Sequence, residues 1–317
     1  MDLICHCIGR GDCGSVWAFE GDHECYKRED GGTGRSIVKD QIMHRRVLQR
    51  DPPACIQVPQ SFGIAEHTDT IGRVRFPDGS TAYRKYHRME RIPAMPKAVR
   101  QKLIDMYCPE ELQDLVATNR DDEDCLVRPY VGRRRASRQV RLQRFSLRNY
   151  PLHVNQMEEL GLDTHALARI LADALAHCHW VAQIDANGIE FVLAPTSAKK
   201  ENPEPSLFEA FDGKFAVWMF DYDFCRPMSQ DEAGVDEAVH AFYRNDPYYP
   251  RPFAYGYTDE DASLWKTFRT RFLETSRRIF GQRDGVDGVR LATLLIEKIE
   301  EEGRRKSKRA SRDTSEF

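Results

Sequence analysis

The sequence has no run of about 18 apolar residues, the shortest stretch that spans a membrane as a helix. Its first residues lack a basic segment followed by a long apolar one, so we expect no secretory signal. An excess of one charge is also lacking, because 47 Lys and Arg stand against 50 Asp and Glu, a formal net charge of -3. This near balance argues against a dedicated nucleic-acid-binding protein, although it is compatible with a local basic patch.

Cysteine pairs with metal-binding spacing are missing as well. Nine cysteines are present, an odd number, and none forms a CxxC pair. With no export signal, we expect reduced thiols in the cytosol or nucleus. A zinc site needs about four ligands, and the two local clusters, Cys5-His6-Cys7 and His177-Cys178-His179, are explained by alternating strand positions and by helix burial. We therefore expect no structural zinc and a cytoplasmic protein. A nuclear location is the alternative, because the basic run 304–309 fits a nuclear signal as well as a solvated tail.

The 317 residues are 41% apolar and 31% charged, which fits a soluble globular protein of two modest domains or of two lobes. The first part predicts a β-meander near 3–8, 15–19 and 25–27, a helix from Ile37 to Leu48, and strands at 56–62 and 83–92, the last after a turn at 77–79. The second part predicts strands at 125–131, 189–193 and 215–220 and helices near 99–107, 232–243, 261–279 and 288–301. The clearest amphipathic helix has apolar residues at helical spacing from Leu167 to Cys178, after a cap at Asp163-Thr164. The charged residues 303–317 predict a disordered tail.

A glycine pattern, Gly9-x-Gly11-x-x-Gly14-x-Val16, lies between the first two predicted strands. A plain hairpin explains it equally well when it is taken alone. A glycine-rich turn that leads into a helix would indicate dinucleotide binding, but here a second strand follows. The hairpin instead resembles the loop that covers the phosphates in protein kinases. Lys27 on the next strand then matches the lysine that holds the α- and β-phosphates, although a surface lysine is the simpler alternative.

The segment from His177 to Leu193 resembles the kinase catalytic loop without gaps. Asp185 matches the catalytic aspartate, which positions and deprotonates the acceptor hydroxyl. Asn187 stands where many protein kinases have a lysine that contacts the γ-phosphate. Glu190 stands where the metal-binding Asn is expected, and glutamate is also a hard oxygen ligand for Mg²⁺.

A second acidic segment follows an apolar strand, at Asp221-Tyr222-Asp223. It resembles the Asp-Phe-Gly segment of kinases, so Asp221 is expected to bind Mg²⁺. Asp223 is the alternative ligand if the register differs by two residues, because both side chains would then share one face.

The segment Tyr86 to Ile92 resembles the hinge between the kinase lobes. There Met89 corresponds to the gatekeeper, and backbone groups of Glu90 to Ile92 correspond to those that pair with adenine.

These elements occur in the kinase order and extend over about residues 4–280. The segments 125–135, 185–193, 220–226 and 245–252 further resemble a fungal protein-kinase-like family of unknown function, whose members are often labelled zinc-finger proteins, within the protein kinase/aminoglycoside phosphotransferase-like fold. The resemblance implies an α+β, bilobal fold, with a small β-rich lobe at 1–92, a larger helical lobe at 93–302 and the tail at 303–317. It carries no established reaction, so function has to be argued from the site.

Several residues depart from the kinase pattern. No Glu occurs between Asp30 and Glu66, so the usual helical partner of the lysine is missing. Spacing places His44 at that position, and Asp40 pairs with Lys27 only if the helix is shifted. Ile184 replaces the Arg that precedes the catalytic aspartate. No activation-loop signature follows Asp221, which favours a small-molecule acceptor over a regulated protein kinase.

Two further segments keep two interpretations each. The arginine-rich stretch 128–148 either binds an anionic substrate or phosphorylated partner, or is a solvated face that balances Asp121 to Asp124. The aromatic segment 245–252 shapes the substrate floor or supports the Asp185 loop, unless it is purely structural.

The function that these features indicate is an ATP-dependent phosphotransferase that uses Mg²⁺ or Mn²⁺ and acts on a small molecule. One alternative is a pseudokinase that serves as a nucleotide-binding or scaffold module. Another is a kinase-fold enzyme that transfers AMP or activates a carboxylate. The expected partners are a nucleotide and an unknown acceptor, with no membrane and no nucleic acid.

Overall fold

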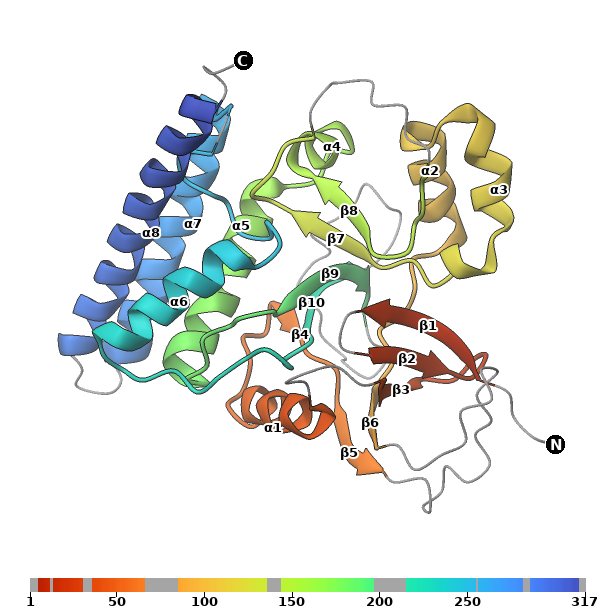
Figure 1. Cartoon of the computed structure of the whole chain (residues 1–317), viewed down its shortest axis with the longest axis horizontal. Helices are drawn as coiled ribbons and strands as arrows, with labels where there is room; N and C mark the ends of the chain where they lie inside the picture. The colour runs from red at the N-terminus through yellow and green to blue at the C-terminus, as the bar shows by residue number, and fades with distance from the viewer. Residues whose placement is uncertain are drawn as a thin grey trace.

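The computed structural model describes residues 5–11, 14–30, 36–65, 85–135, 144–196, 215–254, 256–281 and 286–313. Two β-sheets and a set of helices form an α+β fold, as the sequence predicts (Figure 1). The turn expected at 77–79 and the tip of the glycine hairpin at 12–13 lie outside the described residues.

The first sheet is antiparallel and has the strand order β1-β2-β3-β6-β5. Its strands are β1 (His6–Gly11), β2 (Gly14–Ala18), β3 (Glu24–Glu29), β6 (Tyr86–Glu90) and β5 (Ser61–Ala65). Helix α1 (Ile37–Leu48) is capped by the Ser36 side chain and packs against β3, β5 and β6. The predicted meander and helix are therefore confirmed.

The second sheet has the order β4-β10-β9-β7-β8. Its strands are β4 (Ile56–Gln57), β10 (Phe215–Phe220), β9 (Glu190–Pro195), β7 (Val127–Tyr130) and β8 (Tyr150–His153). The expected single strand at 56–62 is wrong, because β4 pairs with β10 in this sheet whereas β5 belongs to the first sheet. The β4–β10 pair is parallel and joins chain segments that are distant in sequence.

The helices gather mainly beside the second sheet (Figure 1). They are α2 (Lys97–Tyr107), α3 (Gln113–Thr118), α4 (Val154–Glu159), α5 (Thr164–Ala176), α6 (Glu232–Arg244), α7 (Asp259–Gly281) and α8 (Val286–Asp313). Helix α5 begins at the predicted cap, where the Asp163 carboxylate accepts a hydrogen bond from the Ala166 amide at 2.7 Å. It packs along α7, which in turn packs against α8.

The C-terminal helix is longer than the sequence predicts. Helix α8 continues to Asp313, so residues 303–313 are helical and not the start of a disordered tail. The reason is contact with the rest of the fold: Gly303 is buried beside Pro252 and Tyr243. Tertiary packing therefore stabilises a segment that its charged sequence alone would not order.

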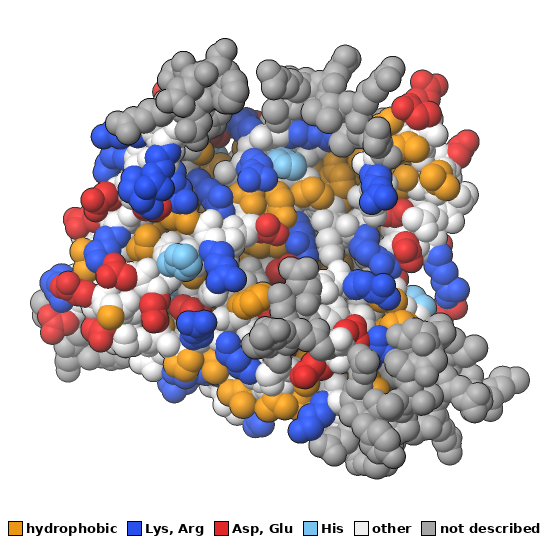
Figure 2. Space-filling model, in the orientation of Figure 1, with side chains coloured by type: hydrophobic (Ala, Val, Ile, Leu, Met, Phe, Trp, Pro, Cys, Tyr) orange, Lys and Arg blue, Asp and Glu red, His pale blue; other side chains and the backbone are white. Residues whose placement is uncertain are grey.

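Side chains of both charges are interspersed over the face shown in Figure 2, as the nearly balanced composition suggests. Among the helices that the structure describes, none combines the length and the apolar character that crossing a bilayer requires.

Candidate active site

A cleft of about 470 Å³ lies where the glycine hairpin, β3 and the end of β6 meet the ends of β9 and β10. Twelve of the thirteen residues that the sequence predicts for the site line this cleft: Gly9, Gly11, Gly14, Val16, Lys27, Met89, Glu90, Ile92, Asn187, Glu190, Asp221 and Asp223. Asp185 is the exception, since it is buried but is not among the lining residues. Five segments that are dispersed along the sequence thus meet in one cavity.

Lys27 is held in the middle of β3 by backbone pairing with Val16 on β2 and His87 on β6. Its Nζ lies 2.7 Å from Asp221 Oδ1 and 3.1 Å from Asp40 Oδ2. Burial alone would lower the pKa of Lys27, but the surrounding carboxylates, Asp221 first, raise it well above its usual value. The side chain is therefore a permanent cation in the cleft.

Asp40, which the spacing offers as a partner of Lys27 only for a shifted helix, is a partner of Lys27 in the structure. Its Oδ1 accepts a hydrogen bond from the Tyr222 amide at 2.9 Å, and its Oδ2 faces both Lys27 and His87. Burial opposes its charge, yet Lys27 and His87 keep the pKa of Asp40 below its usual range. Placing His44 opposite Lys27 is thus wrong, and α1 supplies the counter-charge one turn earlier.

His44 has a different role in the packing of α1. Its Nε2 lies 2.7 Å from the Pro59 carbonyl oxygen, and its ring stacks on that of Tyr222 with centroids 5.1 Å apart. Burial lowers the pKa of His44 to about 4, so the imidazole is neutral near pH 7. It holds the helix against the segment that carries the acids.

The three predicted metal ligands have different surroundings. Asp221 follows β10 in a left-handed backbone conformation, with φ of 64°, and points its Oδ1 at Lys27. Burial raises its pKa to about 6; Lys27 opposes this shift, whereas Asp40 and Asp223 add to it. Both carboxylate oxygens of Asp223 are buried and have no hydrogen-bond partner among the residues that the structure describes. Such oxygens fit a cation, because a buried carboxylate without a partner is costly.

Glu190, the third predicted ligand, already has a cationic partner. It begins β9, directly opposite Phe220 on β10, and its Oε2 accepts a hydrogen bond from Arg128 at 2.6 Å. Arg128 also contacts Asp246 at 3.2 Å. Burial raises the pKa of Glu190 to about 7, although Arg128 opposes that shift. Sequence reasoning missed Arg128 as a cleft residue.

The Asp185 loop is fastened by backbone hydrogen bonds. Asp185 Oδ1 accepts from the amides of Asn187, at 3.1 Å, and Arg226, at 2.9 Å. Asn245 binds the same loop twice, donating to the Ala186 carbonyl at 2.8 Å and accepting from the Gly188 amide at 2.7 Å. The expectation that segment 245–252 supports this loop is therefore confirmed for Asn245. Burial raises the pKa of Asp185 above its usual value.

The expected hinge lies at the edge of the cleft. The Glu90 carboxylate accepts a hydrogen bond from the Gln60 amide, and the Glu90 amide donates a hydrogen bond to the Gln60 carbonyl oxygen at 2.9 Å. Ile92 packs against a buried cluster that contains Val192 and Trp218, and Ile92 and Phe220 give the cleft an apolar wall. Among the described residues, none forms a hydrogen bond with the Ile92 backbone. Apolar faces beside open backbone groups are what a flat heterocycle such as adenine requires.

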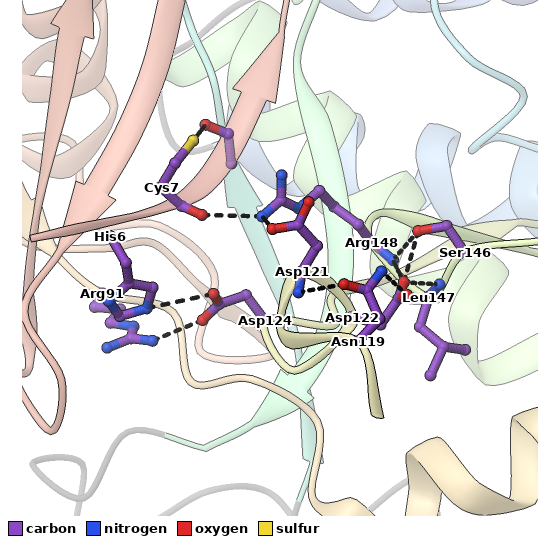
Figure 3. Close-up of polar contacts among 11 residues, drawn as sticks. His6, Cys7, Arg91, Asn119, Asp121, Asp122, Asp124, Ser146, Leu147 and Arg148 are labelled. Carbon is purple, nitrogen blue, oxygen red and sulfur yellow. Dashed lines mark hydrogen bonds and ion pairs between the residues drawn. The ribbon is translucent and has the colours of Figure 1, made fainter. Parts of the chain in front are cut away.

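The acidic run 121–124 joins three parts of the chain near the cleft (Figure 3). Asp121 pairs with Arg148 at 3.3 Å, and Asp124 pairs with Arg91, beside the expected hinge, at 2.7 Å. Asp122 accepts hydrogen bonds from the Ser146 hydroxyl and the Leu147 amide, both at 2.6 Å. These acidic residues therefore mainly connect separate segments of the chain.

The arginine stretch does not behave as one surface. Arg148 balances the acidic run, as one interpretation predicts. Arg128 lies in the cleft, and Arg134 pairs with Glu158 and Asp261 at 2.7 and 2.8 Å. Residues 136–143 of the stretch lie outside the described part of the chain.

The described residues contain no group of three or more His, Cys, Asp or Glu side chains arranged to hold a metal ion. Mg²⁺ differs from zinc in this respect, because it keeps several waters and is bound by one or two carboxylates together with phosphate oxygens. Asp221 and Asp223 fit that second pattern.

Comparison with protein families matches residues 217–284 to the DUF3669 family, which is described as a zinc finger protein. The matched region begins within β10, includes Asp221 and Asp223, and extends beyond α7. A comparison with curated proteins found no match. The match covers less than half of the chain, and it coincides with the segment that carries two of the cleft acids.

Proposed function

We propose that the chain is an ATP-dependent phosphotransferase with a bilobal, protein-kinase-like fold, which uses Mg²⁺ or Mn²⁺ and acts on a small-molecule acceptor. The observation that carries this proposal is Lys27, a buried lysine fixed between Asp221 and Asp40 in a cleft beneath a glycine hairpin. A phosphate-binding cation, acids for a metal ion and a glycine-rich backbone cover are the parts that phosphoryl transfer requires. Residues 1–92 and 93–302 would form the two lobes.

The glycine hairpin would cover the phosphates with backbone amides. At Gly14 a Cβ atom would lie 2.1 Å from the Arg28 carbonyl oxygen, so only glycine allows this close approach of β2 to β3. Gly9 and Gly11 have no such contact with backbone and would leave room for the nucleotide. Lys27, which pairs with Val16 of the same hairpin, would hold the α- and β-phosphates.

Asp221 and Asp223 would hold the divalent cation, with Glu190 as the predicted third ligand. When bound, the cation would neutralise charge on the phosphate oxygens. Asp185 would orient the acceptor hydroxyl and accept its proton, and Asn187, which lines the cleft two residues later, would donate a hydrogen bond to the transferred group. The raised pKa of Asp185 makes it a better base near pH 7 than a solvated aspartate.

The connection between β10 and α6 supports a small acceptor. Only the stretch from Asp221 to Asp231 separates the two elements. That stretch is short and is bound to the Asp185 loop through Arg226 and Pro227. It leaves little chain to form a platform for a peptide substrate.

A pseudokinase is the second candidate, because two features of the site favour it. The Asp185 carboxylate binds backbone amides and is not among the residues that line the cleft. Glu190 is already paired with Arg128. In that case the cleft would bind nucleotide without turnover.

Thermal unfolding with ATP, with and without Mn²⁺ or Mg²⁺, tests the proposal. A ligand at 100 times its Kd stabilises the fold by about 2.7 kcal/mol, which raises the Tm by several degrees. We expect a metal-dependent shift in the wild type and in Lys298→Met, a surface lysine paired with Asp236, but none in Lys27→Met. No shift in the wild type would overturn the phosphotransferase and the nucleotide-binding form of the pseudokinase, and would leave a scaffold module.

Turnover separates the two candidates. We expect ADP as the nucleotide product, and a loss of several powers of ten in rate in Asp185→Ala. Binding without ADP formation by the wild type would leave the pseudokinase. Release of pyrophosphate, with AMP attached to the acceptor or freed from an activated carboxylate, would point to AMP transfer or carboxylate activation.

A further inference from the structure

Arg128 occupies an unusual place for a residue of the arginine-rich stretch. It comes from β7, its side chain is only 17% exposed, and it lines the cleft. One nitrogen of its guanidinium donates to Glu190 at 2.6 Å, and another donates to Asp246 at 3.2 Å. Tyr130, two residues along β7, holds Asp246 through its hydroxyl at 2.7 Å. The guanidinium is thus fixed from two sides.

Glu190 is the residue at the position of a second metal ligand, five residues after Asp185. Its negative charge is neutralised by Arg128 without any metal ion. A divalent cation at this carboxylate would have to lie beside a fixed guanidinium, and like charges at such distances repel strongly in a partly buried site. The Glu190 side of the cleft therefore does not fit a cation while Arg128 is in place.

The opposite side of the cleft has the reverse balance. Both oxygens of Asp223 are buried without a partner in the described part of the chain, and Asp221 uses only Oδ1 to bind Lys27. The negative charges of Asp221 and Asp223 are therefore only partly balanced by neighbouring cations, whereas the charge of Glu190 is balanced by Arg128. One cation, not two, matches this distribution.

In the part of the cleft around Arg128, two more buried polar atoms, one of them in Arg128 itself, lack a hydrogen-bond partner among the described residues. They are Arg128 Nε and the hydroxyl of Tyr248, which also lines the cleft. Both can donate hydrogen bonds. Donors of this kind suit the oxygens of a phosphate group, and arginine is the side chain best matched to phosphate geometry.

We propose that Arg128 takes the place of a second divalent cation, so that the cleft holds its nucleotide with one metal ion, at Asp221 and Asp223, and with the guanidinium of Arg128. Glu190 and Asp246 are then positioning residues for Arg128. This inference rests on the proposed nucleotide site, and it replaces the expectation that Glu190 binds metal.

The test counts Mn²⁺ ions bound per chain at saturating AMP-PNP, a nucleotide that is not hydrolysed, by equilibrium dialysis and electron paramagnetic resonance. We expect one ion in the wild type. Arg128→Gln is expected to bind two, because Glu190 loses its cation, and to bind AMP-PNP about tenfold more weakly. The matched control is Arg134→Gln, an arginine of the same stretch that pairs with Glu158 and Asp261 outside the cleft, and it is expected to behave as the wild type.

Glu190→Gln supplies a second measurement if Arg128→Gln does not fold. It is expected to keep one bound Mn²⁺, whereas a metal-binding Glu190 would lose an ion. Two ions in the wild type, or none in Glu190→Gln, would overturn the role of Arg128 and leave the nucleotide site standing. Failure of the wild type to bind AMP-PNP at all would overturn the proposed function, and this inference with it.

Discussion

Gly188 allows the Asp185 loop to lie close against the segment that contains Phe224. It lies between Asn187 and Ile189 with φ of 78°, in the left-handed region. A Cβ atom at this position would lie 2.8 Å from Cβ of Phe224. Any other residue would therefore meet both backbone strain and a steric clash.

The substitution Gly188→Ala is expected to reduce the free energy of unfolding by about 2–3 kcal/mol, since the left-handed conformation costs 1–2 kcal/mol and the clash adds to it. Gly161 is the matched control, because its φ is 73° but a Cβ there would meet nothing within 4 Å. Gly161→Ala should cost about 1 kcal/mol. Urea unfolding of both variants measures the difference, and equal losses would show that Phe224 moves aside.

For individual residues, the sequence predicts which residues belong to the site better than it predicts which side chains pair with one another. Lys27 and Asp221 were assigned from motifs, and they meet at 2.7 Å. Residue spacing favours His44 over Asp40 as the partner of Lys27, because spacing cannot tell how a helix is rotated and shifted against a sheet. Arg128 could not be separated from the other arginines of its stretch, since burial depends on where β7 lies in the second sheet.

Elements with strong periodicity were predicted well. Helices α5, α6 and α7 and strand β10 lie where their patterns place them. Strand β8 and helices α3 and α4 were missed. They have four to six residues each, and β8 contains a proline, so their stability comes from neighbours and not from local pattern.

In the last turns of α8, tertiary contacts keep the chain helical although its charged composition favours disorder. The Arg304 guanidinium lies 4.7 Å from the centre of the Phe253 ring, and the Lys306 ammonium lies 5.3 Å from that of Tyr243. Gly303 is in close contact with Pro252, where a Cβ would lie 2.6 Å from its carbonyl oxygen. Arg304 and Lys306 thus lie over aromatic rings, while about half of each side chain stays exposed to solvent.

A chain that ends at Glu302 is expected to lose about 2 kcal/mol of stability, because two cation–π contacts and the buried turn at Gly303 are removed. A chain that ends at Ala310 keeps these contacts and is expected to match the full-length protein. Thermal unfolding of the two truncated proteins provides the comparison. Equal melting temperatures for the shorter and the longer chain would mean that these contacts contribute nothing.

For the molecule as a whole, buried histidines set the sensitivity to acid. Burial lowers the pKa of His44, His177 and His179 to about 4 each. The folded state therefore favours their neutral forms, whereas in the unfolded chain they take up protons near pH 6.5. Their contribution to stability is present in full above pH 6.5 and is lost as the pH falls towards 4.

Each of these histidines is expected to cost about 2 kcal/mol of stability between pH 7 and pH 5. The variant His179→Asn can still donate a hydrogen bond to the Ile184 carbonyl, because its amide nitrogen takes the place of Nδ1, but it does not titrate, so its loss over this range should be smaller than that of the wild type by about that amount. Urea unfolding at the two pH values gives the comparison. The pKa of Asp221 is raised to about 6, so its protonation stabilises the folded state as the pH falls. This opposing effect is the same in the wild type and in the variant, and it cancels in the comparison. Identical losses would contradict the assignment.

The parallel pairing of β4 with β10 has a consequence for how the protein is made. On the ribosome, the partner strand of Ile56 and Gln57 is translated roughly 160 residues later. At 5–20 residues per second, this interval lasts about 8 to 32 seconds. During that time the nascent chain holds Lys27 and Asp40 without Asp221 and leaves β4 unpaired, so the emerging polypeptide has to be kept from aggregating until the later strand arrives.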